Sequence, residues 1–596
     1  MTTYNTGNPL GSTDARDLSD NAQNLDKAVN SSDLTFIDRL GMTRPTWNGL
    51  AQYAGPAYDV SNYASLAAAV AAFPSTPATI QYGEDQTLTA NLVVPAHIEL
   101  MPLNGAVISH GAYTVTVNSS TARWPLAQIF NGTGDVTGLQ EAYPQWFGTD
   151  GAADQVQIRA ALVASATVRL VGSYDVGETI EVAGNRSILG VDAGVPAYQP
   201  TVINHSAASG PLFSAVSNEF GGVRIANFMI TGGNGSPAIV SSRAQSVYEY
   251  LHMEPYNGGG IQLLATGAGS WGTTIRECKW VAPASPTAYT GYEISVNGGD
   301  VTLDHVTAIR GAIGINILQG ETITLITPST NYQSNNPSGT VYSSATSENT
   351  AGIKLSGAGY KKSITILNPY IEAFTHGLYV ESVEGLNLLG GYIADAGLNS
   401  NNSSVFLKDA NCVGVKLTGA TISSNGNSSS SIKIGSGVNG SILEGLIISD
   451  TGIGSGNINN VGGANIYLLS NKLTYGGTGY GLSDTVYGTV NLDATVTGFS
   501  NYKRVQTVQA ATAAELVSIA NAEMWEATAF TNGAVGTAGK RSLIVVDNAG
   551  TARVETLATW TAGGYNVTFT VAGGKIKVSH DSGGAVSLNI ALQKLK

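Results

Sequence analysis

A repeat of irregular length runs through the middle of this 596-residue chain and restricts its fold more than any other feature. Eight segments of eight residues align when a buried aliphatic residue is placed at the third position. They read VRIANFMI (223–230), TTIRECKW (273–280), VTLDHVTA (301–308), ITLITPST (323–330), ITILNPYI (364–371), LNLLGGYI (386–393), VKLTGATI (415–422) and SILEGLII (441–448). The third positions lie 22 to 50 residues apart. A recurring shortest period with longer members predicts a solenoid whose turns carry loop insertions.

A second family of short strands lies between these segments. Its members alternate apolar and polar residues and are bounded by Gly, Ser or Asn: GGIQLLATG, GYEISVNGG, GIGINILQG, AGIKLSG, HGLYVES, SSVFLKD, SSIKIGS and ANIYLLS. Two or three short strands per period predict stacking about 4.8 Å apart around one long core. The fixed length and asparagine ladder of leucine-rich repeats are missing. We therefore expect an all-β chain built on a right-handed parallel β-helix, a pectate-lyase-like solenoid.

The alignment also predicts which side chains face the core, because the third, sixth and eighth residues of the first strand family should point inward. Cys278 takes the sixth place, so we interpret it as a small buried hydrophobe rather than a nucleophile. Cys412 lies in a turn between strands and is also expected to be structural. With only two cysteines, the chain has no disulfide framework.

Composition and charge narrow the class of function. Charged residues make up 12% and hydrophobic residues 43%, with 73 glycines, which does not suit a disordered chain. The net charge of −13 argues against nucleic acid as a partner. No His or Cys spacing resembles a zinc site, so we expect no metal and no cofactor. The longest apolar stretch, 65–73, is too short to insert into a membrane.

The segments that flank the repeat have different patterns. We expect helices over 12–30, over 63–73 and over 154–166, the last covering the open end of the solenoid. Residues 76–140 are patterned as β-strands, and 505–596 predict a compact antiparallel β domain. The first helix carries an apolar stripe with heptad-like spacing that suits a small trimeric bundle: Leu18, Ala22, Leu25 and Val29.

Two motifs outside the repeat resemble phage tailspikes. The run TGNPLGSTDARDLSDNAQNLDKAVN…DRLG…RPTWNGL (6–50) resembles the virion-attachment start of many tailspikes and tail fibres. The stretch FNGTGDVTGLQEAYPQWFGTDGAADQVQIRAAL (130–162), followed by VRLVGSYDVGETIEV, is similar to the segment that joins this anchor to the β-helix. Its centre is Trp146, Phe147 and Gly148. The motifs cover roughly the first third of the chain, and the remainder matches by architecture.

The resemblance implies three parts and a place in the virion. They are a virion-attachment region (1–140), a capping helix with the β-helix body (141–504) and a C-terminal β domain for trimerisation or carbohydrate binding (505–596). It implies a homotrimer in the virion tail, joined to a tail or baseplate protein by the N-terminal domain. The partner at the host surface would be capsule or O-antigen, usually met with hydrolase or lyase activity. The N-terminus lacks a basic start and an apolar run, so no signal peptide is expected, which opposes a secreted pectinase.

Two consecutive rungs carry the predicted catalytic site. With Ile371 and Ile393 inward, Tyr370 and Tyr392 should both point outward, stacked as flat faces for sugar rings. Glu372 should also point outward, and Asp395 lies one place further along the next rung. Neighbouring rungs could hold two carboxylates within the roughly 5–9.5 Å that glycoside hydrolysis uses. We predict Glu372 and Asp395 as the catalytic pair.

The adjoining strands add predicted substrate-binding groups. His376 and Tyr379, together with Glu381, follow the first of these rungs, and Lys354 projects from the rung before it. These residues, with Tyr370 and Tyr392, are expected to line one outer groove. The opposing interpretation is that such carboxylates are solvated or ion-paired, and that the tyrosines pack between subunits.

Other residues and other functions compete with this hypothesis. Asp304 and His305 share a rung with Arg310, Glu348 lies in the insertion 331–350, and Asp450 occupies the column of Asp395 but is separated from it by Ser424. A polysaccharide lyase would need cations beside a uronate, and the sequence shows no dense basic cluster. The available cations are Lys354, Lys361, Lys362 and Arg310. A third possibility is a spike that binds its receptor without cutting it.

Overall fold

The computed structural model describes most of the chain. The described residues are 14–38, 41–48, 57–120, 124–149, 151–191, 201–217, 220–266, 269–283, 287–297, 299–332, 350–357, 359–395, 403–424, 430–450, 458–460, 466–469, 472–475, 486–487, 502–508, 514–518, 524–531, 539–546, 552–560, 567–572, 575–580 and 586–594. They fall into two compact units, residues 1–180 with 186–191, and residues 181–185 with 192–596.

The first unit begins with helices and continues as short parallel rungs. Its helices are α1 (Ala15–Asn30), α3 (Leu66–Ala71) and α4 (Gln155–Ala164), so all three predicted helices are present. Strands β3 (Ala57–Asp59), β4 (Ala78–Tyr82) and β7 (Ile98–Pro102) pair in parallel. So do β5 (Gln86–Thr87), β8 (Ile108–Gly111) and β10 (Phe130–Gly132), and likewise β6 (Leu92–Val94), β9 (Val115–Val117) and β11 (Val136–Thr137). Parallel stacking of strands therefore begins in the region patterned as β upstream of α4.

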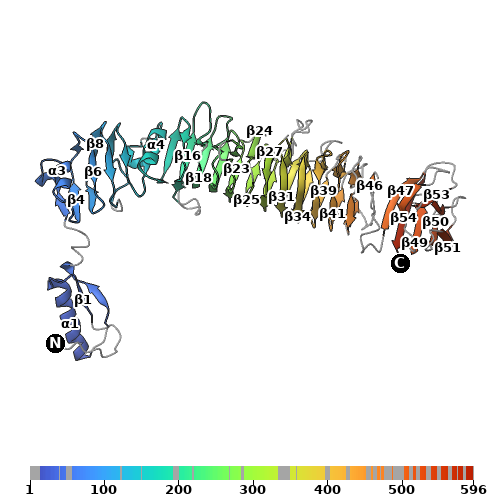
Figure 1. Ribbon diagram of the computed structural model, residues 1–596, viewed down its shortest axis with the longest axis horizontal. Coiled ribbons are helices and arrows are strands. Elements are labelled where there is room, and N and C mark those ends of the chain that lie inside the picture. Colours follow the sequence, from blue (N-terminus) through green and yellow to red (C-terminus); the bar gives the residue numbers. More distant parts are fainter. Residues whose placement is uncertain are drawn as a thin grey trace, which may run out of the picture. The chain divides into compact units, whose positions relative to one another are not determined.

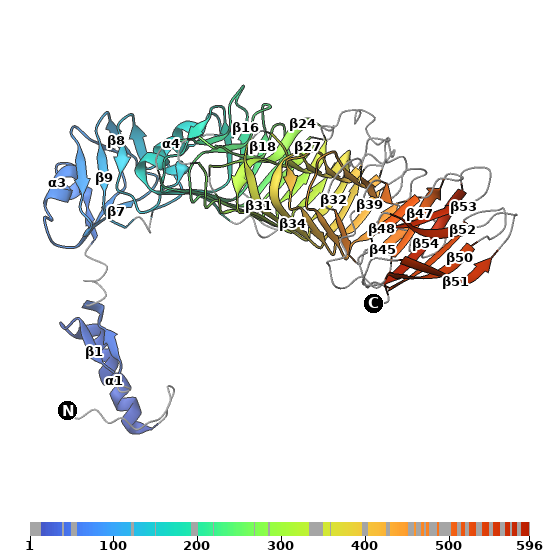
Figure 2. The same ribbon diagram turned by 45° about the vertical axis from the view of Figure 1, so that its right-hand side comes forward.

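The chain forms a right-handed parallel β-solenoid of about 13 turns, as predicted (Figures 1 and 2). Most turns in the second unit contain three strands, so the strands stack in three columns. The first column contains β22 (Thr274–Arg276), β25 (Val301–Asp304), β28 (Ile323–Ile326), β31 (Lys361–Leu367), β34 (Val383–Leu389), β38 (Lys416–Thr418), β41 (Ile442–Glu444) and β44 (Tyr467–Leu469). The second contains β23 (Lys279–Val281), β26 (Thr307–Ile309), β29 (Ser329–Asn331), β32 (Tyr370–Phe374), β35 (Tyr392–Asp395), β39 (Thr421–Ser424), β42 (Ile447–Asp450) and β45 (Lys472–Tyr475).

The third column contains β21 (Ile261–Leu263), β24 (Thr287–Ser295), β27 (Gly311–Glu321), β30 (Ala351–Leu355), β33 (His376–Val380), β36 (Ser403–Leu407), β40 (Ser430–Ile434), β43 (Ile458–Asn460) and β46 (Val486–Tyr487). Earlier turns use the long strands β18 (Val223–Gly232) and β20 (Val247–Tyr256) for the first two columns, followed by β19 (Ile239–Ser241) and β21. Each strand is hydrogen-bonded in parallel to its counterpart one turn earlier, so the columns are continuous ladders.

The predicted core positions are confirmed. The aligned third residues are fully buried, at 0% exposure: Ile225, Ile275, Leu303, Leu325, Ile366, Leu388, Leu417 and Leu443. Cys278 and Cys412 are buried free cysteines, and burial raises the pKa of the Cys278 thiol to about 12. A thiol that resists ionisation is a poor nucleophile, which supports a structural role for Cys278.

One turn escaped the sequence alignment. The 50-residue interval between Ile225 and Ile275 contains Tyr248, which pairs with both of them on neighbouring strands and is buried like them. A tyrosine at a position otherwise held by aliphatic residues hid this rung from the pattern.

The fifth residue of the repeat lies at the corner between the first and second columns, and the backbone conformation there explains which residue types occur. The backbone there is left-handed, with φ of 66° at Asn227, 51° at Glu277 and 46° at Thr327, and it continues through Gly390, Gly419 and Gly445. Asn and Gly adopt this conformation most readily, which accounts for their frequency at the fifth place.

A stack of small residues lines the entry to the third column. The residue before the first inward side chain of each strand is small throughout: Gly260, Gly291, Gly314, Gly352, Gly377, Ser404 and Ser431. A Cβ at Gly352 would lie 2.2 Å from Cγ2 of Ile371 and 2.8 Å from the backbone oxygen of Gly377. The side chain of Ile371 and the backbone of Gly377, both from the next turn, therefore fill the space that a side chain would need.

We expect Gly352→Ala to destabilise the β-helix by about 1–3 kcal/mol, because the added methyl group forces Ile371 or the backbone to move. The thermal unfolding midpoint measures this effect. Gly83→Ala is the control, since the nearest atom to its added Cβ, in the Asn104 side chain, lies 3.5 Å away. Equal shifts for the two variants would contradict the close-packing explanation.

The last strands pair in antiparallel fashion. One sheet has the order β47 (Tyr502–Val508), β54 (Val586–Lys594), β49 (Met524–Thr531), β50 (Gly539–Val546) and β51 (Ala552–Trp560). Another has β48 (Ala514–Ser518), β53 (Lys575–His580) and β52 (Val567–Ala572). This pairing differs from that of the solenoid, which matches the change in sequence pattern near residue 505.

Candidate functional site

The two tyrosines predicted to stack do so. Tyr370 on β32 pairs with Tyr392 on β35, and their ring centroids lie 5.7 Å apart with 29° between the ring planes. Tyr370 is 45% exposed, and Tyr392 is partly exposed. The predicted outward ladder is therefore confirmed as geometry. Its role in binding sugar stays a prediction.

Glu372 lies on the same outer face and is held by two neighbours. Asn331, one turn earlier, donates a hydrogen bond from Nδ2 to Oε2 of Glu372 over 3.2 Å. The Tyr370 hydroxyl also bonds to Glu372, and this bond is the main reason why the pKa of Tyr370 rises to about 12. A carboxylate oriented beside an exposed aromatic ring is well placed to exchange protons with a bound sugar.

Asp395 follows an irregularity in the ladder. The pairing runs Tyr370 to Tyr392 and Ile371 to Ile393, but the next pair joins Phe374 to Asp395. Glu372 and the left-handed Ala373 (φ 66°) lie within the irregular step. The backbone of Asp395 is thus opposite Phe374, at the end of β35, and its side chain is outside the described structure. Its pairing with Glu372 in catalysis stays a prediction.

The remaining predicted binding residues lie on the third column rather than on the second. Lys354 is on β30, and His376 and Tyr379 are on β33. His376 is only 1% exposed and Tyr379 only 3%. The structure therefore separates the predicted site into two groups of side chains. We call the second group the lysine–aromatic cluster; its members are Lys354, His376, Tyr379, Glu381, Phe406, Lys408 and Lys433.

Two lysines lie on either side of two aromatic residues along one ladder of the lysine–aromatic cluster. Lys354, Tyr379, Phe406 and Lys433 occupy the same place in four successive turns. The Nζ atom of Lys354 is 5.4 Å from the Tyr379 ring centroid, and that of Lys433 is 4.7 Å from the Phe406 centroid. A third ammonium group, that of Lys408, lies 5.6 Å from the Tyr379 centroid. These distances are typical of cation–π contacts.

The cluster holds one carboxylate, Glu381, beside its three ammonium groups, and this carboxylate pairs with one of them. Glu381 bonds to Lys408 at 2.8 Å, which lowers the pKa of Glu381 and raises the pKa of Lys408. Burial lowers the pKa of Lys354, and the charge of Lys408 lowers it further, although Glu381 opposes the shift. The cluster thus concentrates positive charge on a chain whose net charge is −13.

Sequence reasoning missed Phe406, Lys408 and Lys433, and therefore the basic cluster. Aligning the second strand family would have found part of it, because AGIKLSG, HGLYVES, SSVFLKD and SSIKIGS carry Lys354, Tyr379, Phe406 and Lys433 at one shared position. The intervals between these strands differ in length, and this difference concealed the shared position.

His376 is a neutral imidazole packed between Tyr379 and Phe406, whose ring centroids lie 5.4 and 5.3 Å from its own. Burial lowers its pKa to about 4. In the unfolded chain the pKa is about 6.5, so the folded state binds fewer protons between these values. The contribution of the neutral His376 side chain to the stability of the folded state is fully present above pH 6.5 and is lost as the pH falls toward 4.

We therefore expect His376→Phe to weaken the acid sensitivity of folding between pH 6.5 and 4, by up to about 3 kcal/mol over that range. Unfolding midpoints measured as a function of pH would show a shallower slope than in the parent protein. Identical slopes for His376→Phe and the parent would show that His376 titrates normally.

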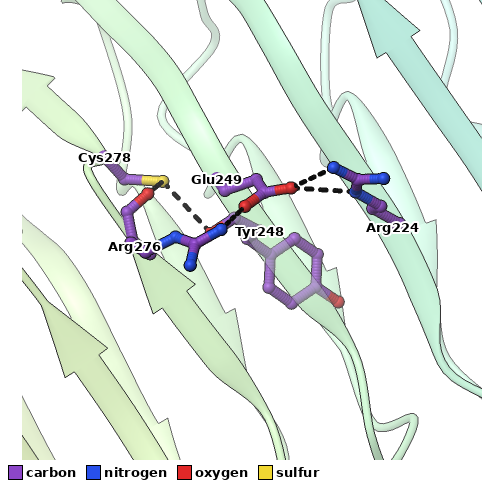
Figure 3. A network of polar contacts seen from close by, with 5 residues as sticks. All are labelled: Arg224, Tyr248, Glu249, Arg276 and Cys278. Carbon is purple, nitrogen blue, oxygen red and sulfur yellow. Dashed lines mark hydrogen bonds and ion pairs between the residues drawn. The ribbon is translucent and has the colours of Figure 1, made fainter.

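A second charged group, on the first column, is a closed ion-pair network (Figure 3). Glu249 is 2% exposed and accepts hydrogen bonds from Arg224, at 2.6 and 2.8 Å, and from Arg276. Burial by itself raises the pKa of Glu249, but the two guanidinium groups outweigh this effect and hold the pKa below its ordinary value. Tyr248 and Cys278 pack beside the network. The three charged residues join successive turns, which is a structural role.

The competing candidates are dispersed. His305 Nδ1 lies 2.7 Å from Oδ1 of Asp304. None of the contacts recorded for the described residues joins Arg310 to either of them. Lys361 is buried, and its Nζ donates to the carbonyls of Gly357 and Gly359 at 2.9 Å. Lys362 pairs with Glu384 at 3.7 Å. Glu348 and the side chain of Asp450 are outside the described residues.

Two classes of site find no support in the described part of the chain. Within those residues, no group of three His, Cys, Asp or Glu side chains could hold a metal ion. The described helices include none with the length and apolar character needed to cross a membrane.

Among solved structures, the chain matches phage tailspike proteins and a bacterial surface adhesin at low identity. The tailspike protein of Acinetobacter phage vB_ApiP_P1 matches with a TM-score of 0.34 and 11% identity, covering 76% of this chain and 87% of that one. Tailspike gp49 of Acinetobacter baumannii bacteriophage Fri1, a capsular polysaccharide depolymerase, matches with 0.29 and 12%, covering 76% and 86%. PfbA, a surface adhesin of Streptococcus pneumoniae, matches with 0.29 and 12%, covering 84% and 98%. No family model and no curated protein sequence matches the chain.

Proposed function

We propose that this protein is a phage tailspike that binds a bacterial surface polysaccharide, O-antigen or capsule, and depolymerises it. The observation that carries the proposal is the exposed Tyr370–Tyr392 stack with Glu372 hydrogen-bonded beside it. Flat aromatic faces bind the apolar faces of sugar rings, and an adjacent carboxyl group can exchange protons with a glycosidic oxygen. The long ladder of outward side chains suits a polymer better than a small molecule.

The proposed reaction is endo-acting glycoside hydrolysis. One carboxyl group of the pair Glu372 and Asp395 would protonate the departing glycosidic oxygen as the bond from that oxygen to the anomeric carbon breaks. The other, as a carboxylate, would take a proton from water, whose oxygen forms the new bond to the anomeric carbon. Their position on β32 and β35, one turn apart, supports this pairing. Because the strand register between them is irregular, variants of each carboxyl group are needed to test the pair.

The assembly follows from the same proposal. We propose a homotrimer in the virion tail that attaches to a tail or baseplate protein through the N-terminal region. The stripe predicted on α1 supports this, because Leu18 is 53% and Leu25 65% exposed in a single chain. Exposed leucines at heptad-like spacing suit burial in a helical bundle.

A polysaccharide lyase is the second candidate, and the lysine–aromatic cluster favours it. Ammonium groups would neutralise a uronate, a base would remove the proton beside the carboxylate, and the bond to the departing oxygen would break to leave a double bond. The cluster supplies the cations, but its only tyrosine, Tyr379, is 3% exposed. Hydrolysis at the exposed tyrosine stack therefore stays the favoured mechanism.

The test uses purified protein and surface polysaccharide from strains on which it forms haloes. Chromatography follows chain length, and ultraviolet absorbance follows any conjugated double bond in the same run. Shorter chains without new absorbance are the expected result, and shorter chains with rising absorbance would establish the lyase. Intact chains on a polysaccharide that the protein binds would show a receptor-binding spike without catalysis.

A further inference from the structure

The lysine–aromatic cluster contains more ammonium groups than carboxylates. Several other described cations of the β-helix have a carboxylate partner, as Lys279 has Glu254 and Lys416 has Glu444, and Lys361 donates to backbone carbonyls. In the cluster, Glu381 forms its ion pair with Lys408. Among the described residues, Lys354 and Lys433 form no ion pair and lie instead over aromatic rings. Two partly buried ammonium groups near a third repel one another, so the arrangement favours an incoming anion.

The cluster is extended along the axis of the solenoid. Lys354 and Lys433 are three turns apart in one ladder, which places their backbones about 14 Å apart at about 4.8 Å per turn. Lys408 belongs to a turn between them. This spacing suits a chain with repeated negative groups better than a single small anion.

We infer that the lysine–aromatic cluster binds the carboxylate groups of an acidic polysaccharide, so that the natural substrate contains acidic sugars. This inference rests on the proposed function and narrows its substrate class. Lys354, Lys408 and Lys433 hold successive negative groups of the glycan by charge-assisted hydrogen bonds. The site is a binding subsite on the third column, separate from the tyrosine stack on the second.

The experiment measures binding of the halo-strain polysaccharide before and after chemical reduction of its carboxyl groups to alcohols. Lys354→Met and Lys433→Met should each weaken binding of the native form by about tenfold, the worth of one charge-assisted bond. Reduction should weaken binding to the parent protein and remove the difference between parent and variants. Lys354→Arg should retain binding, because it keeps the charge.

Lys416→Met is the matched control, since it removes a lysine of similar exposure from the first column and should change binding less than twofold. Unfolding midpoints confirm that each variant folds. If the parent binds and cuts native and reduced polysaccharide equally well, the inference is wrong and the proposed function stands. If neither form is bound, the proposed function itself fails, and the inference with it.

Discussion

Replacing Glu372 by Gln is expected to slow cleavage of the polysaccharide by about 10²- to 10⁴-fold, because proton transfer by a positioned carboxyl group contributes that much to catalysis. The amide keeps the size of the side chain and can still contact Asn331 and the Tyr370 hydroxyl. Binding should therefore change little. Initial rates of new reducing ends measure the first effect, and titration with the intact polysaccharide measures the second.

Glu384→Gln is the control for this variant. Glu384, on β34 of the first column, is also an exposed glutamate of the β-helix, but it pairs with Lys362. Its replacement should leave cleavage within about twofold. Cleavage by Glu372→Gln at the parental rate would remove Glu372 from the mechanism.

Asp395→Asn separates the two halves of the proposed pair. A loss of rate comparable to that of Glu372→Gln is expected if Asp395 is the second carboxylate. A large loss for Glu372→Gln with an unchanged rate for Asp395→Asn would place the second carboxylate elsewhere, since the irregular step at Ala373 leaves Asp395 opposite Phe374.

Replacing both Arg224 and Arg276 by Met is expected to destabilise the β-helix by about 3–5 kcal/mol. Glu249 is almost completely buried, and the double variant leaves its charge without a partner. The thermal midpoint and the urea midpoint should both fall. Arg159→Met is the control, because its partner Glu178 is 61% exposed and such a pair contributes less than about 1 kcal/mol.

The same double variant should invert the effect of pH. In the parent protein the pKa of Glu249 is below its ordinary value, so the pair stabilises folding above the unfolded pKa of about 4.3. That stabilisation is lost as the pH falls through the folded pKa. In the variant, burial acts alone and raises the pKa, so protonation should recover part of the lost stability as the pH falls toward 4. A variant that loses stability in acid as the parent does would show that solvent reaches Glu249.

The amino-acid sequence by itself determined the solenoid and its inward faces. A parallel β-helix repeats one residue pattern per turn, so the aliphatic third positions and the buried eighth positions are visible without coordinates. Asn or Gly at the fifth place of most segments matches the left-handed corner, although Glu277, His305 and Thr327 adopt the same conformation. The outward stacking of Tyr370 on Tyr392 followed, because one aligned register carries each side chain to the same face.

Only the tertiary structure decided how the outer surface is divided. The regular alternation of inward and outward side chains fails at two places. One is the irregular step in strand pairing that sets Asp395 opposite Phe374. The other is the corner between columns, because His376 and Tyr379 lie on the third column and the tyrosine stack lies on the second. Loops of unequal length separate Tyr379 from Lys408 and Lys433 in the sequence, and only stacking of the turns brings them together. Inward residues are fixed by a pattern that every turn shares, whereas outward neighbours depend on register between turns, which insertion lengths conceal.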